Sequence, residues 1–122
     1  MKGNCVMRFE GISREFSLRD EGQYETIGAF WDELSAIYGL ENLRGLGYRW
    51  DGDTIFYAIG LKDGCIDGCN FSIDLPDGGW TMVRGQTDDL KQMYDEIYKS
   101  GRLRFEIEIF FNDGSCEIKY CR

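Results

Sequence analysis

Two glutamates in segment 105–111, Glu106 and Glu108, alternate with large apolar side chains. Because side chains alternate across a β-strand, Glu106, Glu108 and Phe110 would share one face, and the two isoleucines and Phe111 the other. We expect the isoleucine face to pack under helices and the glutamate face to look into a cleft or into solvent. A carboxylate in an aromatic cleft incurs a desolvation cost that a bound cation offsets. The segment therefore predicts a cation site, against the simpler alternative of a solvated sheet face.

Three aromatic residues of a predicted central hairpin, Tyr48, Trp50 and Tyr57, are candidates for the walls of that site. An aromatic ring attracts a cation by about 0.5–2 kcal/mol, and a tyrosine adds a hydroxyl that orients a ligand. Alternation places Tyr48 and Trp50 on one face, so one set of aromatics should be core and the other should face the cleft. The alternative is that all three are ordinary strand aromatics, favoured by β-propensity.

The sequence contains no histidine. This excludes Ser-His-Asp and Cys-His catalysis, and zinc sites that need histidine. A glutamate in an apolar cleft can act as a general base, so Glu106 or Glu108 activating water beside Tyr57 and Trp31 is the enzymatic alternative. Since no nucleophile–base pair and no oxyanion device accompanies them, binding is favoured over catalysis.

Five cysteines are present, and Cys65 and Cys69 lie in a loop rich in Gly and Asp. Four-thiolate zinc coordination would also need Cys116 and Cys121, and the spacing is not that of a zinc motif. The acidic residues of the loop do not follow the calcium-binding pattern of an EF-hand. We therefore expect no metal and no cofactor, and thiols that stay reduced as small apolar groups.

Length and charge narrow the class of protein further. The chain has 122 residues, the size of one domain, and a formal net charge of −8. A nucleic-acid-binding domain usually carries a basic face, which this composition does not supply. No stretch approaches the roughly 18 apolar residues of a membrane-spanning helix, and the first residues do not resemble a signal peptide. We expect a cytoplasmic protein that binds neither nucleic acid nor membranes.

The first half of the chain predicts one helix and three strands. Its apolar residues recur at helical spacing before Gly39, and an Asp-Gly turn separates two aromatic-rich runs. The expected elements are a strand at 6–13, a helix at about 25–38, and strands at 43–50 and 54–61 around Asp51-Gly52-Asp53.

The second half predicts the same order. Thr87 is expected to cap a helix that has Asp88 and Asp89 in its first turn. The segment 62–79 is expected to be a crossover loop with a short extended piece at 70–75. The other expected elements are strands at 80–85, 103–111 and 115–121, the last two around Asn112-Asp113-Gly114.

The repeated order predicts an α+β fold and a single domain, 1–122. Two β-α-β-β halves, about 5–61 and 70–121, would be related by a pseudo-twofold axis. They would form one antiparallel sheet with two helices on one face and a central cleft where the halves meet.

Several segments resemble, in the same order, the GyrI-like small-molecule-binding domain, which is also the effector-binding domain of bacterial multidrug-sensing transcription activators. The resemblance covers most of the chain and includes an aromatic–Trp pair in the first helix and a Phe-Glu pair in a later strand. The matching segments are 27–34 (IGAFWDEL), 38–40 (YGL), 56–61 (FYAIGL), 74–80 (DLPDGGW), 104–108 (RFEIE) and 116–120 (CEIKY).

The resemblance implies that this domain binds a hydrophobic, cationic small molecule between aromatic walls, with a buried glutamate as counter-charge. It implies that Trp31 and Trp80 line the pocket and that Glu106 or Glu108 carries the charge. Without room for a DNA-binding module, the chain would act as a stand-alone sensor or sequestering module. Other branches imply two alternatives, namely a glutamate-dependent hydrolase of reactive small molecules and an inhibitor of a protein partner, as in the gyrase-inhibiting branch.

Overall fold

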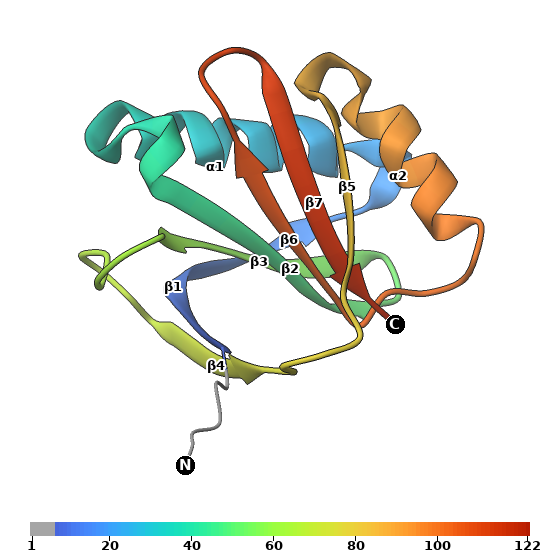
Figure 1. The fold of residues 1–122 in the computed structure, drawn as a ribbon, viewed down its shortest axis with the longest axis horizontal. Coiled ribbons are helices and arrows are strands. Elements are labelled where there is room, and N and C mark those ends of the chain that lie inside the picture. Colours follow the sequence, from blue (N-terminus) through green and yellow to red (C-terminus); the bar gives the residue numbers. More distant parts are fainter. Residues whose placement is uncertain (1–6) are drawn as a thin grey trace.

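The computed structural model describes residues 7–122, so Cys5 and the start of the predicted first strand lie outside the described residues. Seven strands form one curled antiparallel sheet, a half-barrel, and two helices cover one of its faces (Figure 1). The strand order is β4-β1-β3-β2-β6-β7-β5. The elements are β1 (Met7–Ser17), α1 (Gln23–Tyr38), β2 (Leu43–Asp51), β3 (Thr54–Leu61), β4 (Phe71–Leu75), β5 (Thr81–Gln86), α2 (Leu90–Tyr98), β6 (Phe105–Phe110) and β7 (Ser115–Cys121).

The α+β class and the expected order of strands and helices are confirmed. Both Asp-Gly turns close hairpins, with Gly52 and Gly114 at positive φ angles of 61° and 90°. The short extended piece expected at 70–75 is β4, which pairs with β1. The prediction that Thr87 caps the second helix is wrong. Residues Thr87–Asp89 form a 3-10 turn, and α2 begins at Leu90 without a side-chain capping hydrogen bond.

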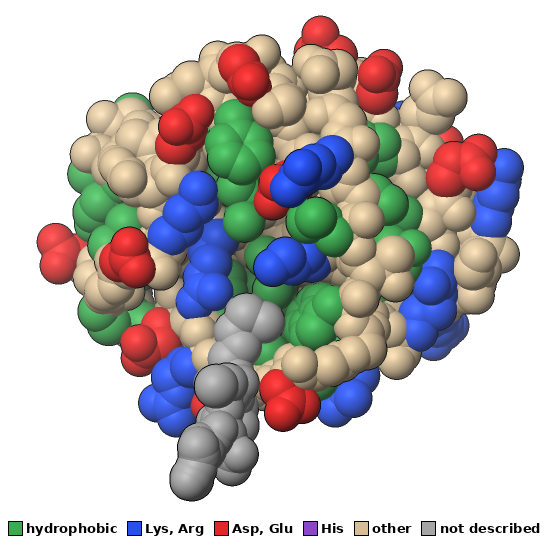
Figure 2. All heavy atoms as spheres, in the orientation of Figure 1, with side chains coloured by type: hydrophobic (Ala, Val, Ile, Leu, Met, Phe, Trp, Pro, Cys, Tyr) green, Lys and Arg blue, Asp and Glu red, His purple; other side chains and the backbone are tan. Residues whose placement is uncertain are grey.

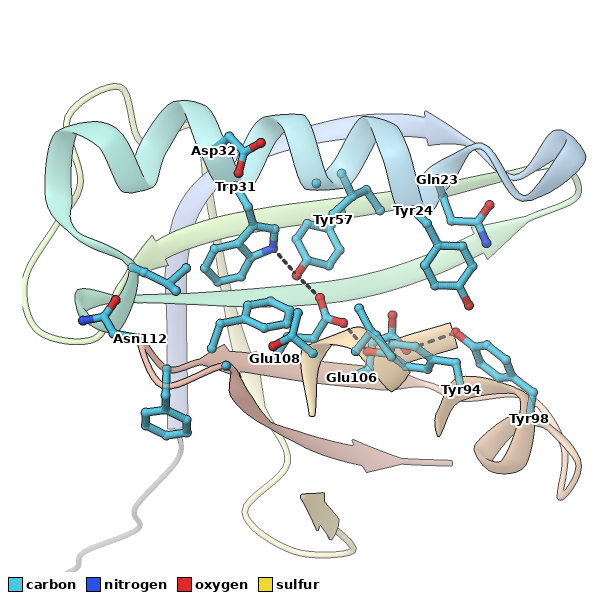
Figure 3. Close-up of a pocket in the computed structure, with 18 residues that line it drawn as sticks. Gln23, Tyr24, Trp31, Asp32, Tyr57, Tyr94, Tyr98, Glu106, Glu108 and Asn112 are labelled. Atoms are coloured by element: carbon cyan, nitrogen blue, oxygen red, sulfur yellow. Dashed lines mark hydrogen bonds between the residues drawn. The ribbon is translucent and has the colours of Figure 1, made fainter. Parts of the chain in front are cut away.

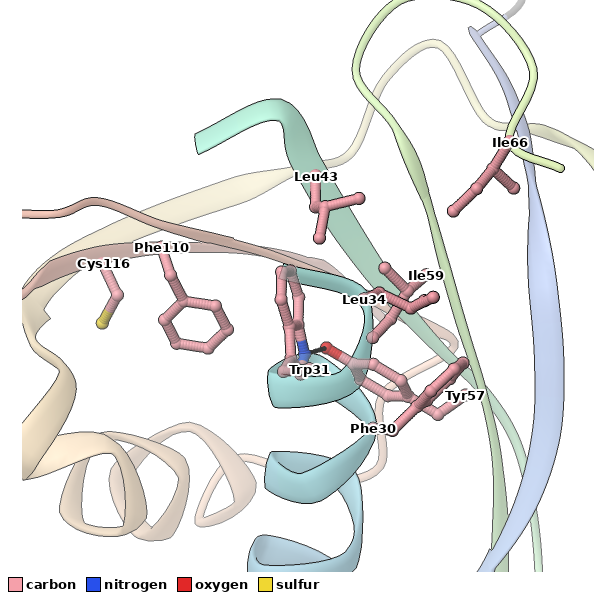
Figure 4. Packing of buried hydrophobic residues seen from close by; sticks show 9 residues of the cluster. All are labelled: Phe30, Trp31, Leu34, Leu43, Tyr57, Ile59, Ile66, Phe110 and Cys116. Carbon is pink, nitrogen blue, oxygen red and sulfur yellow. Dashed lines mark hydrogen bonds between the residues drawn. The ribbon is translucent and has the colours of Figure 1, made fainter. Parts of the chain in front are cut away.

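The helices pack on one face of the sheet. From α1, the buried side chains Phe30, Trp31 and Leu34 meet residues of β3, β6 and β7 in one apolar cluster (Figure 4). From α2, Tyr94 and Ile97 pack with residues that include Ile118 of β7. The space between the two helices therefore lies over the centre of the sheet, around β6.

The curl of the sheet creates a second core on its other face. The rings of Tyr48 in β2 and Phe71 in β4 stack at 4.4 Å, although two strands separate β2 from β4 in the sheet. Such contact requires strong curvature, because neighbouring strands are about 4.8 Å apart. Figure 2 views the open side of this curl, where Lys and Arg side chains lie over apolar ones. Among the cation–π contacts of the protein, the Arg44 guanidinium lies 4.9 Å from the ring of Phe9, a residue of this second core.

The second core overturns the expected orientation of β6. Ile107 is buried among Phe9, Leu46 and Leu75, away from the helices. The opposite face of β6, which carries both glutamates, lies under the helices. The alternation was predicted correctly, but the choice of face was wrong, because the curl buries the isoleucine side without any helix.

Two glycines in β2 make room for large side chains on the helix-covered face. A Cβ atom on Gly45 would overlap the Tyr57 hydroxyl and lie 2.8 Å from a ring carbon of Trp31. A Cβ atom on Gly47 would lie 2.6 Å from Oε1 of Glu106. Because neither glycine has a side chain, the side chains of Tyr57, Trp31 and Glu106 can lie directly against the backbone of β2.

We predict that Gly45→Ala destabilises the protein by about 1–3 kcal/mol, because the added methyl group overpacks two large buried rings. Gly78→Ala is the matched control, since a Cβ atom there meets nothing within 4 Å. Urea unfolding measures both variants. Equal stability of the two variants would contradict the proposed tight packing at Gly45.

Candidate ligand-binding site

A cavity of about 500 Å³ lies between α1 and α2, above β6 (Figure 3). Its floor contains Glu106, Glu108 and Phe110 of β6, together with Tyr57 of β3. The helices supply mostly apolar and aromatic walls. The wall residues are Tyr24, Ile27 and Trp31 from α1, and Leu90, Tyr94 and Tyr98 from α2.

A chain of hydrogen bonds holds Glu108 in place. The Trp31 indole N–H donates to the Tyr57 hydroxyl at 2.9 Å, and that hydroxyl donates to Oε1 of Glu108. The Tyr94 hydroxyl donates to Oε2 at 2.6 Å. Both oxygens of a side chain that is only 5% exposed are thus hydrogen-bonded to phenols. These bonds fix the carboxyl group and favour its ionised form.

Glu106 has weaker support. It is 4% exposed, and the Tyr98 hydroxyl donates to its Oε2 at 3.1 Å. Tyr98 itself is 39% exposed and sits at the end of α2. The two carboxyl groups of β6 therefore share one cavity but differ in their partners, two phenols for Glu108 and one longer bond for Glu106.

Among the described residues, the cavity lining contains acidic side chains and lacks basic ones. None of the cavity-lining residues in the described chain is Lys or Arg. Burial raises the pKa of Glu106 well above its ordinary value, and the neighbouring Glu108 charge raises it further, while Tyr98 and Tyr94 oppose both effects. Burial also raises the pKa of Glu108, although the hydrogen bonds from Tyr57 and Tyr94 oppose that rise. Burial and these carboxyl groups raise the pKa values of Tyr57 and Tyr94, so both phenols remain hydrogen-bond donors.

Five of the eight residues expected at the site line this cavity. They are Glu106, Glu108, Trp31, Tyr57 and Phe110.

The other three lie elsewhere. Tyr48 is in the second core, where its hydroxyl is 2.5 Å from the Ser13 hydroxyl. Trp80 packs beside the same core, and its indole N–H donates to the Pro76 carbonyl at 2.8 Å. Trp50 packs beside Ile97 and Leu103.

A β-bulge explains why Tyr48 and Trp50 do not share a face as expected. The register of β2 against β3 shifts between them, and Arg49 has a positive φ of 51°. The extra residue reverses the alternation beyond Tyr48. Trp50 therefore turns to the helix side, beyond the end of the cavity.

Sequence reasoning missed the tyrosines of α2. Tyr94 and Tyr98 occur at helical spacing among apolar residues and were not among the candidates, yet their hydroxyl groups donate hydrogen bonds to Glu108 and Glu106. Tyr94 and Tyr98 lie four residues apart on one face of α2, and Glu106 and Glu108 lie two residues apart on one face of β6. These matching spacings could have indicated that the two tyrosines contact the two glutamates. The Gly45-Leu46-Gly47 segment was a second signal, because alternate glycines leave one face of β2 without side chains at these positions.

The comparisons with known proteins identify no relative. No protein-family model, no curated protein and no solved structure matches the chain significantly. Within residues 7–122, no three acidic or cysteine side chains come together as a metal site. No helix in this part of the chain is long and apolar enough to cross a membrane.

We predict that Glu106→Gln flattens the pH dependence of stability. A carboxyl group whose pKa is raised in the folded state contributes stability below its unfolded pKa, about 4.3, and loses it as pH rises through the folded pKa. Wild type should therefore lose stability from pH 4 to neutrality relative to Glu106→Gln. Urea unfolding across this range measures the difference, with the exposed Glu96→Gln on α2 as control. Parallel curves for wild type and Glu106→Gln would show that Glu106 is not perturbed.

Proposed function

We propose that this protein binds a hydrophobic small molecule that carries positive charge, in the cavity between α1 and α2. The observation that carries the proposal is the placement of two buried carboxyl groups on the floor of an aromatic cavity with no Lys or Arg in its lining. A buried anion without a counter-charge is costly. A cationic ligand would supply the missing charge and cover the apolar walls at the same time.

Glu108 is the stronger candidate for the counter-charge. Its two phenol donors stabilise the ionised form and hold both oxygens in fixed positions before a ligand arrives. A fixed anion loses little conformational entropy on binding. Trp31 and Phe110, whose rings meet edge to face at 4.8 Å, offer π surfaces beside it. Cation–π attraction of about 0.5–2 kcal/mol per ring would add to the charge pairing.

We also propose a GyrI-like fold, built from two related halves, for this chain. The strand order supports it, because β1-β3-β2 on one side of the sheet corresponds to β5-β7-β6 on the other. In each set, the strand that precedes the helix in the sequence (β1 or β5) pairs with the second strand of the hairpin that follows the helix (β3 or β7). The first strand of that hairpin (β2 or β6) comes next in the sheet. The central pair, β2 and β6, is antiparallel, as a twofold axis between them requires. On this proposal the protein is a sensor or a sequestering module for such ligands.

Hydrolysis of a bound electrophile is the second candidate function. The observation that favours it is the buried position of Glu106, which raises the pKa of its carboxyl group above the ordinary value, the direction that general acid–base catalysis near neutral pH requires. Slow disappearance of a ligand incubated with the protein, lost in Glu106→Gln, would support hydrolysis over simple binding.

We expect quenching of tryptophan fluorescence by 10-methylacridinium, a flat cation, and much weaker binding of the neutral 9-methylacridine. Glu108→Gln should weaken binding of the cation by about tenfold or more, because it removes a charge-assisted interaction. Saturable binding of both compounds with equal affinity would contradict a cation site.

Gly28→Leu tests where the ligand binds. Gly28 lines the cavity, and a Cβ atom there meets nothing within 4 Å. Leucine would fill the space and abolish binding without lowering helix stability, since Leu has a better helix propensity than Gly. Ala29→Leu, one residue along on the exposed side of α1, is the control and should bind normally. Normal binding by Gly28→Leu would place the ligand elsewhere.

A further inference from the structure

The cavity has two carboxyl groups, and one positive charge can neutralise only one of them. We propose that the ligand is a dication, a molecule with an apolar body and two charged nitrogen groups that face Glu106 and Glu108. This inference rests on the proposed function and specifies the chemical class of its ligand.

Within residues 7–122, no Lys or Arg lines the cavity to balance the pair. The titratable groups around the two carboxyls are phenols and a thiol. They are Tyr24 of α1, Tyr57 of β3, Tyr94 and Tyr98 of α2, and Cys116 of β7. Phenols and thiols with raised pKa values remain neutral near pH 7, so none of these groups supplies a positive charge to the pair.

The two carboxyl groups are unequal in the empty site. Both oxygens of Glu108 accept phenol hydrogen bonds, whereas Glu106 accepts one longer bond on Oε2 and its Oε1 lies over the bare backbone at Gly47. Burial and the Glu108 charge together raise the pKa of Glu106. On this proposal Glu108, with its two phenol donors, is the anion of the empty site, and Glu106 carries the proton.

The position of the pair sets the spacing of the ligand charges. Glu106 and Glu108 are two residues apart on one strand face, which corresponds to roughly 6.6 Å along the strand. A monocation at Glu108 leaves Glu106 protonated. A dication replaces that proton, which passes to solvent as the second nitrogen group pairs with the Glu106 carboxylate. One proton is therefore released for each dication bound.

The test compares p-xylylenediamine with 4-ethylbenzylamine by titration calorimetry at neutral pH. The two molecules have the same shape, but an ethyl group in the second replaces an aminomethyl group in the first. Wild type should bind the diamine about tenfold or more tightly, the size expected for one charge-assisted contact. Glu106→Gln should remove most of this preference, and the exposed Glu96→Gln should retain it. Equal affinities in wild type, or a preference retained in Glu106→Gln, would overturn the proposal.

A second measurement needs no variant. Titration of wild type in buffers with different ionisation enthalpies gives the number of protons released. At pH values just below neutrality, the diamine should release more protons per molecule bound than the monoamine. Equal proton release by the two amines would overturn the proposal.

The outcomes also separate this proposal from the proposed function. If 10-methylacridinium binds and neither the diamine nor the monoamine does, the dication proposal fails and the cation site stands. If none of the three cations binds to folded protein, both proposals fail.

Discussion

Two carboxyl groups buried side by side, with no protein cation among the residues that line their cavity, are the constraint on which the rest of this structure depends. Ionised carboxylates in a low-dielectric site are costly, and two adjacent ones repel each other. The surrounding residues reduce this cost with hydroxyl groups. Tyr57 and Tyr94 come from opposite sides of the cavity to Glu108, and Trp31 fixes Tyr57. The arrangement gives one carboxyl group two phenol donors and the other group one, and this unequal pair is the basis of the proposed binding of a positively charged ligand.

The fold accommodates this polar floor because its apolar packing is divided between the two faces of the sheet. Curling of the sheet gives Phe9, Leu46 and Ile107 a core of their own, independent of the helices. The helix-covered face is then free to hold glutamates and phenols between α1 and α2. Gly45 and Gly47 leave the space that these groups need, because a side chain at either position would overlap the aromatic and glutamate groups that lie there. The polar site therefore lies beside apolar clusters on the helix-covered face, while a separate core packs on the other face of the sheet.

Much of the fold could be predicted from local patterns. Helical periodicity before Gly39, the Asp-Gly turns and the alternation in β6 are short-range signals, and each corresponds to an observed element. The face on which Glu106 lies could not be predicted in this way, because it depends on the curl that brings β4 toward β2. Trp50 was misplaced because a bulge at Arg49, with no glycine to mark it, reverses the alternation. The phenol donors on α2 were missed because a tyrosine in an apolar stripe looks like a packing residue until its partner across the cavity is known.

Binding of a dication with release of one proton requires that the empty site hold one proton on the glutamate pair at neutral pH. Infrared spectroscopy of the ligand-free protein tests it most directly, because a protonated carboxyl group has a carbonyl stretch that is separate from carboxylate bands. The account predicts such a band in wild type at neutral pH and its loss in Glu106→Gln. Absence of the band in wild type, with both glutamates ionised in the folded protein, would contradict it.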